Sequence, residues 1–262
     1  MKILATAFTL LLTAASAMAG VTYKLDSKTT GLASANIGGT VKVEGTSMRV
    51  DLATGDGVLF KNGSVVTSKD SGKSLVVADP STKTYYNLDL QDLGGAGPLL
   101  RQLGDSVKMK IENPKVSARD AGDGGTIEGY ATRKRIIDSS YDMVLEVMGQ
   151  QMRMTTVSSS ELWVTDKLSA DLMNFFQLRG FKTGLDEIDR LIEKQASALT
   201  GFPLKQVMTV TIIQNGNEMK STTTINVSDI KQAKVAPAEF ELPQGYAKTQ
   251  GPIEELMQQL KP

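Results

Sequence analysis

The side chains that most often carry enzyme chemistry are missing from this sequence. It contains no histidine and no cysteine in 262 residues. This removes the commonest general base, the commonest metal ligand and any thiolate nucleophile or disulfide. A Ser–Lys pair is conceivable between the run Ser158-Ser159-Ser160 and Lys167. No nucleophile-elbow motif surrounds these serines, so we expect no enzymatic activity.

The remaining polar clusters have simpler explanations than cofactor or metal binding. Asp186, Glu187 and Asp189 crowd the start of an expected helix, where carboxylates are stabilised by the helix dipole. Gly122, Gly124 and Gly125 do not stand between a strand and a helix, so they do not indicate a phosphate-binding loop. We therefore expect no cofactor and no metal.

Methionine is the unusual feature. The chain has 12 methionines, and five of them fall on the apolar faces of expected strands: Met143, Met152, Met154, Met208 and Met219. Thioether side chains are flexible and polarizable, so they suit a cavity that accepts acyl chains of variable shape. They also fill irregular gaps in ordinary cores, and that alternative stays open.

A hydrophobic ligand cavity is the candidate site. Its expected lining is Met143, Leu145, Met152, Met154, Trp163, Leu172, Phe175, Phe176, Met208 and Met219. Trp163 could stand at the mouth of the pocket, or it could be a buried anchor with its indole N–H satisfied.

The element that must position most of these residues is a long hairpin from Ile137 to Val164. Apolar residues alternate with polar ones along both of its strands. A two-residue turn at Gly149-Gln150 would place Val147 opposite Met152 and Leu145 opposite Met154. The same register puts Glu146 beside Arg153 on the polar face.

The rest of the chain predicts a mainly β (α+β) fold. Alternating runs from Val21 to Asp89 indicate an antiparallel meander, and Asn215-Gly216 predicts a second hairpin with Ile212 opposite Met219. Further expectations are a strand over Val107–Ala118, a flexible loop over Asp120–Gly125, amphipathic helices over Leu168–Phe176, Leu185–Leu199 and Ile253–Leu260, and an edge strand over Phe240–Tyr246. Asp92–Gly104 is either a short lid helix or a capped connector.

Residues 1–19 have the layout of a signal peptide: Lys2, an apolar run, then small residues ending at Ala19. We expect a periplasmic or secreted protein with no lipid anchor and one domain over residues 20–262, and no transmembrane segment. The 29 basic and 29 acidic residues balance, so nucleic acid is not an expected partner. We interpret Arg133-Lys134-Arg135, the one basic cluster, as solvated surface.

Several short motifs resemble one bacterial family. They are Gly129-Tyr130 with Lys134, Glu161–Thr165 leading into Leu168, Gly201–Leu204, Asp79–Lys83 with Tyr85, and Phe240–Tyr246. Together they are similar to the DUF4412 group of exported proteins, whose fold is similar to the lipoprotein carriers LolA and LolB. The usual cysteine after the Gly-Tyr pair is absent here. The resemblance implies a curved antiparallel sheet, or half-barrel, with helices plugging its concave face.

Two functions follow as hypotheses. The first is a periplasmic binding module that holds a lipid or a lipoprotein acyl chain in the half-barrel. The second is a non-enzymatic structural or interaction protein of the cell envelope, with the barrel fully plugged and a sheet edge that recruits a partner protein.

Overall fold

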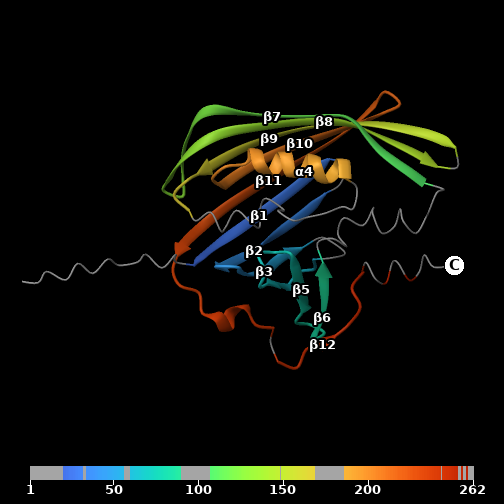
Figure 1. The fold of residues 1–262 in the computed structure, drawn as a ribbon. Helices are drawn as coiled ribbons and strands as arrows, with labels where there is room; N and C mark the ends of the chain where they lie inside the picture. Colours follow the sequence, from blue (N-terminus) through green and yellow to red (C-terminus); the bar gives the residue numbers. More distant parts are fainter. Residues whose placement is uncertain are drawn as a thin grey trace, which may run out of the picture.

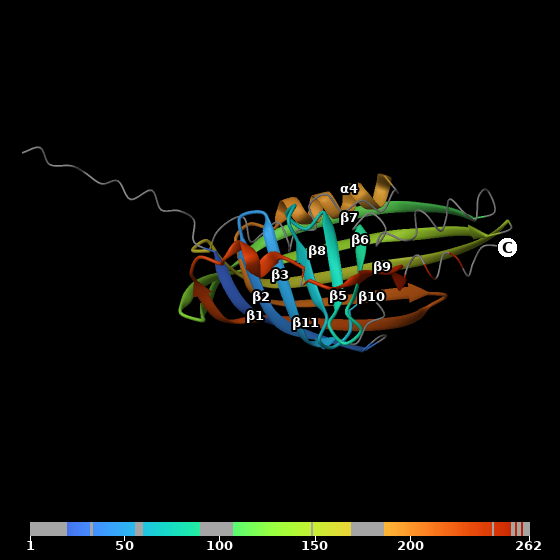
Figure 2. The same cartoon turned by 90° about the horizontal axis from the view of Figure 1, so that it is seen from below.

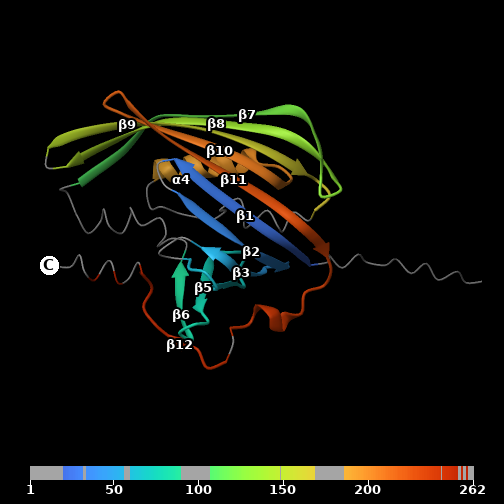
Figure 3. The same ribbon diagram turned by 180° about the vertical axis from the view of Figure 1, so that it is seen from behind.

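The protein is built on one large curved sheet. The computed structural model describes residues 20–31, 34–55, 60–89, 107–147, 149–168, 186–242 and 244–252, with positions 255 and 258. The sheet has 12 strands in the order β12-β6-β5-β4-β3-β2-β1-β11-β10-β9-β8-β7. All neighbouring strands are antiparallel except for β6 and the short β12 (Ala247–Lys248), which are parallel. Figures 1 and 3 show it bent so that β7–β10 lie across from β2–β6.

The strands differ greatly in length. Those of the first half are short: β1 (Val21–Gly31), β2 (Ala35–Glu44), β3 (Ser47–Gly55), β4 (Val65–Ser68), β5 (Ser74–Asp79) and β6 (Thr84–Asp89). Those of the second half are long: β7 (Val107–Ile127), β8 (Tyr130–Val147), β9 (Gln150–Thr165), β10 (Phe202–Gln214) and β11 (Asn217–Gln232). In Figure 2 the long strands project beyond the short ones and beyond the helix. The predicted β-rich fold and curved antiparallel sheet are confirmed.

The second hairpin has the predicted register. Asn215 and Gly216 both have positive φ, 52° and 80°, as the two central residues of a type I′ turn require. The turn aligns Ile212 with Met219, so both side chains lie on one face of the sheet.

The first hairpin is displaced by two residues from the expected register. Val147 pairs with Gln150, Leu145 with Met152 and Met143 with Met154; the predicted pairs are wrong. Because a shift of two preserves the alternation, the methionines keep their expected face. Arg153 is aligned with Val144, and Glu146 is aligned with Gln151. Arg153 forms ion pairs with Glu112 of β7 at 2.8 Å and Asp142 of β8 at 3.1 Å.

Two further expectations about strands are wrong. Residues 120–125 are part of β7 and not a loop, because bulges after Asp120 and Asp123 absorb the extra residues while pairing with β8 continues. Phe240–Tyr246 is not an edge strand: Pro237–Phe240 form a 3-10 helix, η3, that buries Phe240. The edge position is taken by β12 (Ala247–Lys248), which pairs with β6.

The main core lies on the inner face of the β1–β6 half. It is formed by inward-facing residues of the short strands together with the starting residues of β10. Phe202 and Leu204 are 1% and 0% exposed, and the Phe202 ring meets Tyr23 edge-on, with ring centroids 5.7 Å apart. The short strands are therefore anchored by a dense apolar layer.

One helix, α4 (Asp186–Ala198), lies on the inner side of the sheet along β7 (Figures 1 and 2). Gly201, at φ +83°, reverses the chain into β10, and a Cβ there would approach the Thr165 carbonyl oxygen to 3.0 Å. The expected Leu168–Phe176 helix, except Leu168, and the Asp92–Gly104 segment lie outside the described residues, as does most of Ile253–Leu260. Several helices plugging the concave face thus stay a prediction. No helix within the described part is long and apolar enough to cross a membrane.

Candidate functional site

A cavity of about 230 Å³ lies between α4 and the inner face of β8–β10. Its apolar lining consists of Ile137, Leu162, Pro203 and Met208 from the sheet side and Ile192, Ala196 and Leu199 from the helix side. The sheet residues face the same way because each is aligned with another across the strand pairs: Ile137 with Ser160, and Ser160 with Met208.

The polar side chains of the cavity bond to one another. Gln206 Nε2 donates to Ser160 Oγ at 2.8 Å. Gln195 Nε2 of α4 donates to Ser139 Oγ at 2.7 Å, and Ser139 and Ser158 share a hydrogen bond of 2.7 Å. Polar groups that already have hydrogen-bond partners in the protein lose little free energy when an apolar ligand displaces water from the cavity. No charged residue is among those that line this cavity in the described part of the chain.

An apolar strip continues from the cavity toward the hairpin turns. Met143 pairs with Met154 and Ile111, Leu145 pairs with Met152 and Met109, and Ile212 pairs with Met219, all on the inner face. Apart from the buried Ile111, these side chains are half-buried or exposed, and Met152 is 39% exposed. The strip therefore offers apolar surface that the described residues do not bury fully.

The structure distributes the ten predicted cavity residues over four places. Met208 lines the cavity. Met143, Leu145, Met152, Met154 and Met219 lie on the same face but farther along the strands. Leu172, Phe175 and Phe176 lie outside the described residues. Trp163 lies on the opposite face.

The placement of Trp163 corrects the expectation that it lines the cavity. Its neighbour Leu162 takes the inward position, so alternation turns Trp163 outward. There its ring lies between the Lys134 and Lys205 ammonium groups, each 4.8 Å from the ring centroid. Lys134 also pairs with Glu161 at 2.7 Å. Trp163 is thus half-buried on the outer face, where its ring forms cation–π interactions with two lysines.

Sequence reasoning missed most residues of the cavity. Ser158 and Ser160 were considered only for catalysis with Lys167. The Lys167 side chain is exposed, and its ammonium group pairs with Asp166 at 3.8 Å. Ile137 and the apolar side of the expected Leu185–Leu199 helix could have been predicted. Ile137 follows the two-residue alternation of a strand, and the apolar residues of the helix follow a period of 3.6. Gln195 and Gln206 carried none, because amides are ordinary surface residues.

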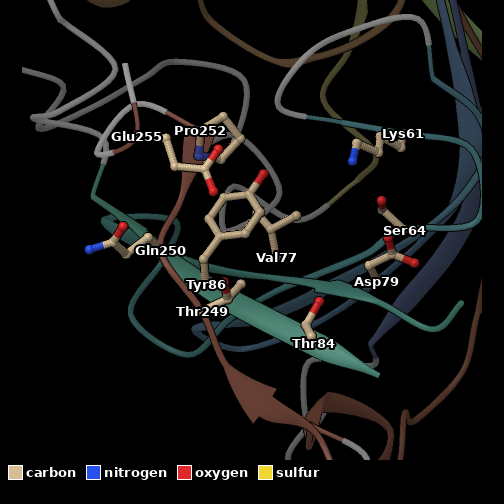
Figure 4. A pocket seen from close by; sticks show the side chains of 10 residues that line it. All are labelled: Lys61, Ser64, Val77, Asp79, Thr84, Tyr86, Thr249, Gln250, Pro252 and Glu255. Atoms are coloured by element: carbon tan, nitrogen blue, oxygen red, sulfur yellow. The ribbon is translucent and has the colours of Figure 1, made fainter. Parts of the chain in front are cut away.

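A second, smaller hollow of about 150 Å³ lies at the other end of the sheet, around β5, β6 and the segment after β12. Figure 4 shows Tyr86 at its centre, with the hydroxyl toward Glu255, and Lys61 and Asp79 on the other side. Burial raises the pKa of Tyr86 to about 12, so its phenol group stays protonated in mildly alkaline solution as well as at neutral pH. The Asp79 carboxylate accepts hydrogen bonds from the hydroxyl and the backbone N–H of Ser81, and the hydroxyl is the main reason that the pKa of Asp79 is lowered. This lining is mixed and polar, unlike the predicted cavity.

No group of three or more acidic side chains is placed to hold a metal ion in the part of the chain that the structure describes.

A family model described as "Domain of unknown function (DUF4412)" matches residues 33–246. No curated protein matches the chain. An uncharacterized conserved protein from Thermus thermophilus is similar in structure, with 11% identity over 88% of this chain and 90% of that one, and a TM-score of 0.39. The LolA superfamily protein NE2245 from Nitrosomonas europaea is 10% identical over 86% of this chain and 90% of its own, with a TM-score of 0.31.

The structure of PNGF-II is 11% identical over 90% of this chain and 32% of its own, with a TM-score of 0.32. At these identities and TM-scores the three similarities support no conclusion about function. The family model, which spans most of the chain, confirms the family predicted from the motifs.

Proposed function

The chain belongs to the DUF4412 family, and from its own geometry we propose that it is a binding module for a hydrophobic ligand, a lipid or an acyl chain. The ligand lies between α4 and the inner face of β8–β10 and extends along the methionine strip. The protein acts without enzymatic activity, in the periplasm or after secretion, once residues 1–19 have been removed. Residues 20–262 act as one domain.

The observation that carries this proposal is the continuity of the cavity with the apolar strip. Met208 lines the cavity, and its inner-face neighbours along β8–β11 include four further methionines. Flexible thioethers adapt to chains of different shape. Each methylene that leaves water contributes about 0.8 kcal/mol to binding.

The volume of the cavity limits how much of a ligand can lie between α4 and the sheet. At about 230 Å³ it lies below the roughly 300–1,000 Å³ of pockets that enclose drug-sized ligands. A short segment of an acyl chain fits under the helix, and a longer chain must continue along the half-buried strip toward the hairpin turns.

The absence of catalytic chemistry is also a proposal. Ser160 accepts a hydrogen bond from Gln206, and Ser158 bonds to Ser139. These partners are neutral, so nothing in these contacts activates a serine as a nucleophile.

The test is binding of the neutral fluorescent probe Nile red to residues 20–262. Ala196→Phe adds an aromatic ring to the cavity from α4, whereas Ser197→Phe adds the same ring to the exposed side of the helix. We expect saturable binding by the wild type, a loss of about tenfold in affinity for Ala196→Phe, and wild-type affinity for Ser197→Phe. Circular dichroism checks that both variants fold.

Absence of probe binding by the wild type would contradict the proposal, and so would equal affinities of the two variants.

The alternative, an interaction protein with a plugged barrel, is favoured by one observation. Among the described strands, the 21-residue β7 has a strand neighbour on one side only, as in edges that recruit a partner chain. A wild-type protein that binds no probe but retains one stoichiometric envelope protein in a crosslinked pull-down would support this alternative.

A further inference from the structure

One arginine, Arg135, lies next to residues that line the cavity, without being part of the lining itself. Arg135 of β8 pairs directly with Leu162 of β9, which lines the cavity. It stands two residues before Ile137, another lining residue, and therefore on the same inner face. Its Nη1 donates a hydrogen bond to Oγ1 of Thr200, the residue after the lining residue Leu199. Arg135 thus stands where the sheet, the end of α4 and the cavity meet.

The guanidinium of Arg135 forms no close ion pair with a carboxylate in the described part of the chain, although its charge acts on Asp120 at longer range and helps to lower the pKa of that carboxyl. Its Nε is buried and forms no hydrogen bond. Four of the other described arginines, at positions 49, 119, 133 and 153, each have a carboxylate oxygen within 2.6–3.1 Å. Arg190 donates from Nε to the backbone carbonyl of Asp186 at 3.1 Å. A buried donor without a hydrogen-bond partner destabilises the folded protein. An anion bound next to the cavity could accept a hydrogen bond from the Arg135 guanidinium and remove this cost.

The carboxylate that faces Arg135 across the β7–β8 pair is already occupied. Asp120 is aligned with Arg135, but its Oδ1 accepts the Gly122 N–H at 2.7 Å. Its Oδ2 accepts from Arg133 Nε and Nη2 at 3.0 and 2.6 Å. Both oxygens of this carboxylate therefore accept their hydrogen bonds from groups other than Arg135, and Arg135 contributes only a weaker charge interaction to the lowered pKa of Asp120.

We infer that the ligand is an anionic amphiphile whose carboxylate or phosphate head group pairs with Arg135 while its chain occupies the cavity. This inference rests on the proposed function and adds the class of ligand. The cavity supplies neutral contacts for the chain, and Arg135 supplies the charge at one end. An Arg–oxyanion pair is geometrically specific because two parallel N–H groups match two oxygens.

The test compares dodecanoate, methyl dodecanoate and dodecyl phosphate as competitors of Nile red at pH 7.5, where the carboxyl is ionised. We expect the wild type to bind at least one of the two anions about tenfold or more tightly than the ester. The better anion identifies the head group, carboxylate or phosphate. Arg135→Gln should reduce this preference to near unity without weakening the ester.

Arg119→Gln is the matched control, because Arg119 lies on the neighbouring strand β7, is exposed and is paired with Asp138 at 3.1 Å, so its removal leaves the partners of Asp120 unchanged. It should keep the wild-type preference. Arg135→Lys, which retains the charge without the planar fork, should keep only part of it.

Equal affinity of the wild type for ester and both anions would overturn this inference and leave the proposed function intact. So would an unchanged preference in Arg135→Gln, with a lower Tm showing that Arg135 only supports the end of α4. Failure of all three competitors to displace the probe, in a protein that binds none of them directly, would overturn the proposed function as well.

Discussion

At the scale of single residues, Asp142 joins three strands on the outer face of the sheet. Its Oδ2 accepts from Asn113 of β7 at 2.9 Å and from Arg153 of β9 at 3.1 Å, and its Oδ1 accepts from Thr155 at 2.7 Å. These interactions, led by the Asn113 hydrogen bond, hold the pKa of the Asp142 carboxyl below its usual value. Asp142 is therefore a pH-dependent stabiliser of the long strands.

Asp142→Asn should lower the Tm by about 1–3 °C near pH 7. Since the folded pKa lies below the unfolded value of about 3.9, the stabilisation is complete above that value and is lost as the pH falls through the folded pKa. The difference between wild type and variant, measured by thermal unfolding, should therefore shrink below about pH 4.

Asp26→Asn, at an exposed position of β1, serves as the control and should change the Tm little at any pH. A difference for Asp142→Asn that stays constant from pH 7 to the acid-unfolding limit would contradict this account of the carboxylate.

Trp163 shows where prediction from single residues fails. The alternation Leu162, Trp163, Val164 separates two faces but does not say which one is inner. The largest side chain was expected inside, yet the inner positions hold Leu162 and Val164, which are 2% and 6% exposed. Two lysines, one from β8 and one from β10, cover Trp163 outside. The Lys205 contact arises from strand pairing across more than 40 positions of sequence, which no local pattern contains.

At the scale of elements, β10 links the core to the cavity. Its first residues are packed among the short strands, with Leu204 fully buried, whereas Met208, four residues on, is half-buried and lines the cavity. Within four residues, β10 thus passes from the closely packed core to the lining of the cavity.

Leu204→Ala should therefore cost about 2–5 kcal/mol of unfolding free energy in urea denaturation. Met208→Ala should cost only about 1 kcal/mol, because its side chain already borders empty volume and has fewer contacts to lose. Equal costs would mean that Met208 is a core residue, as the alternative interpretation of the methionines holds.

The register of the β8–β9 hairpin was beyond sequence analysis for a physical reason. Registers two residues apart place the same side chains on the same faces, so the apolar pattern does not distinguish them. The observed register is accompanied by ion pairs from Arg153 to Asp142 and to Glu112. Glu112 belongs to β7, a strand outside the hairpin. From the hairpin sequence alone, Glu146 was therefore the expected partner of Arg153.

At the scale of the whole molecule, the sheet combines two kinds of interior. The β1–β6 half closes on a large dense core, while the β7–β11 half carries α4, a small buried cluster of Ile137, Leu162 and Val164, a cavity beside it and a half-buried apolar strip. Alternation and turn residues predicted the strands and their general faces. The cavity itself was not predictable, because its position depends on how α4 lies across strands that are far apart in sequence.

The most direct test of this division is a titration of the mature chain, labelled with ¹³C in its methionine methyl groups, with dodecanoate followed by NMR. We expect saturable shifts of the methyl signals of Met208 and of strip residues such as Met143 and Met154. Met48, 9% exposed in the core of the other half, should not move. Unchanged Met208, Met143 and Met154 signals, or shifts of Met48 as large as theirs, would contradict a ligand site on the inner face of β8–β10.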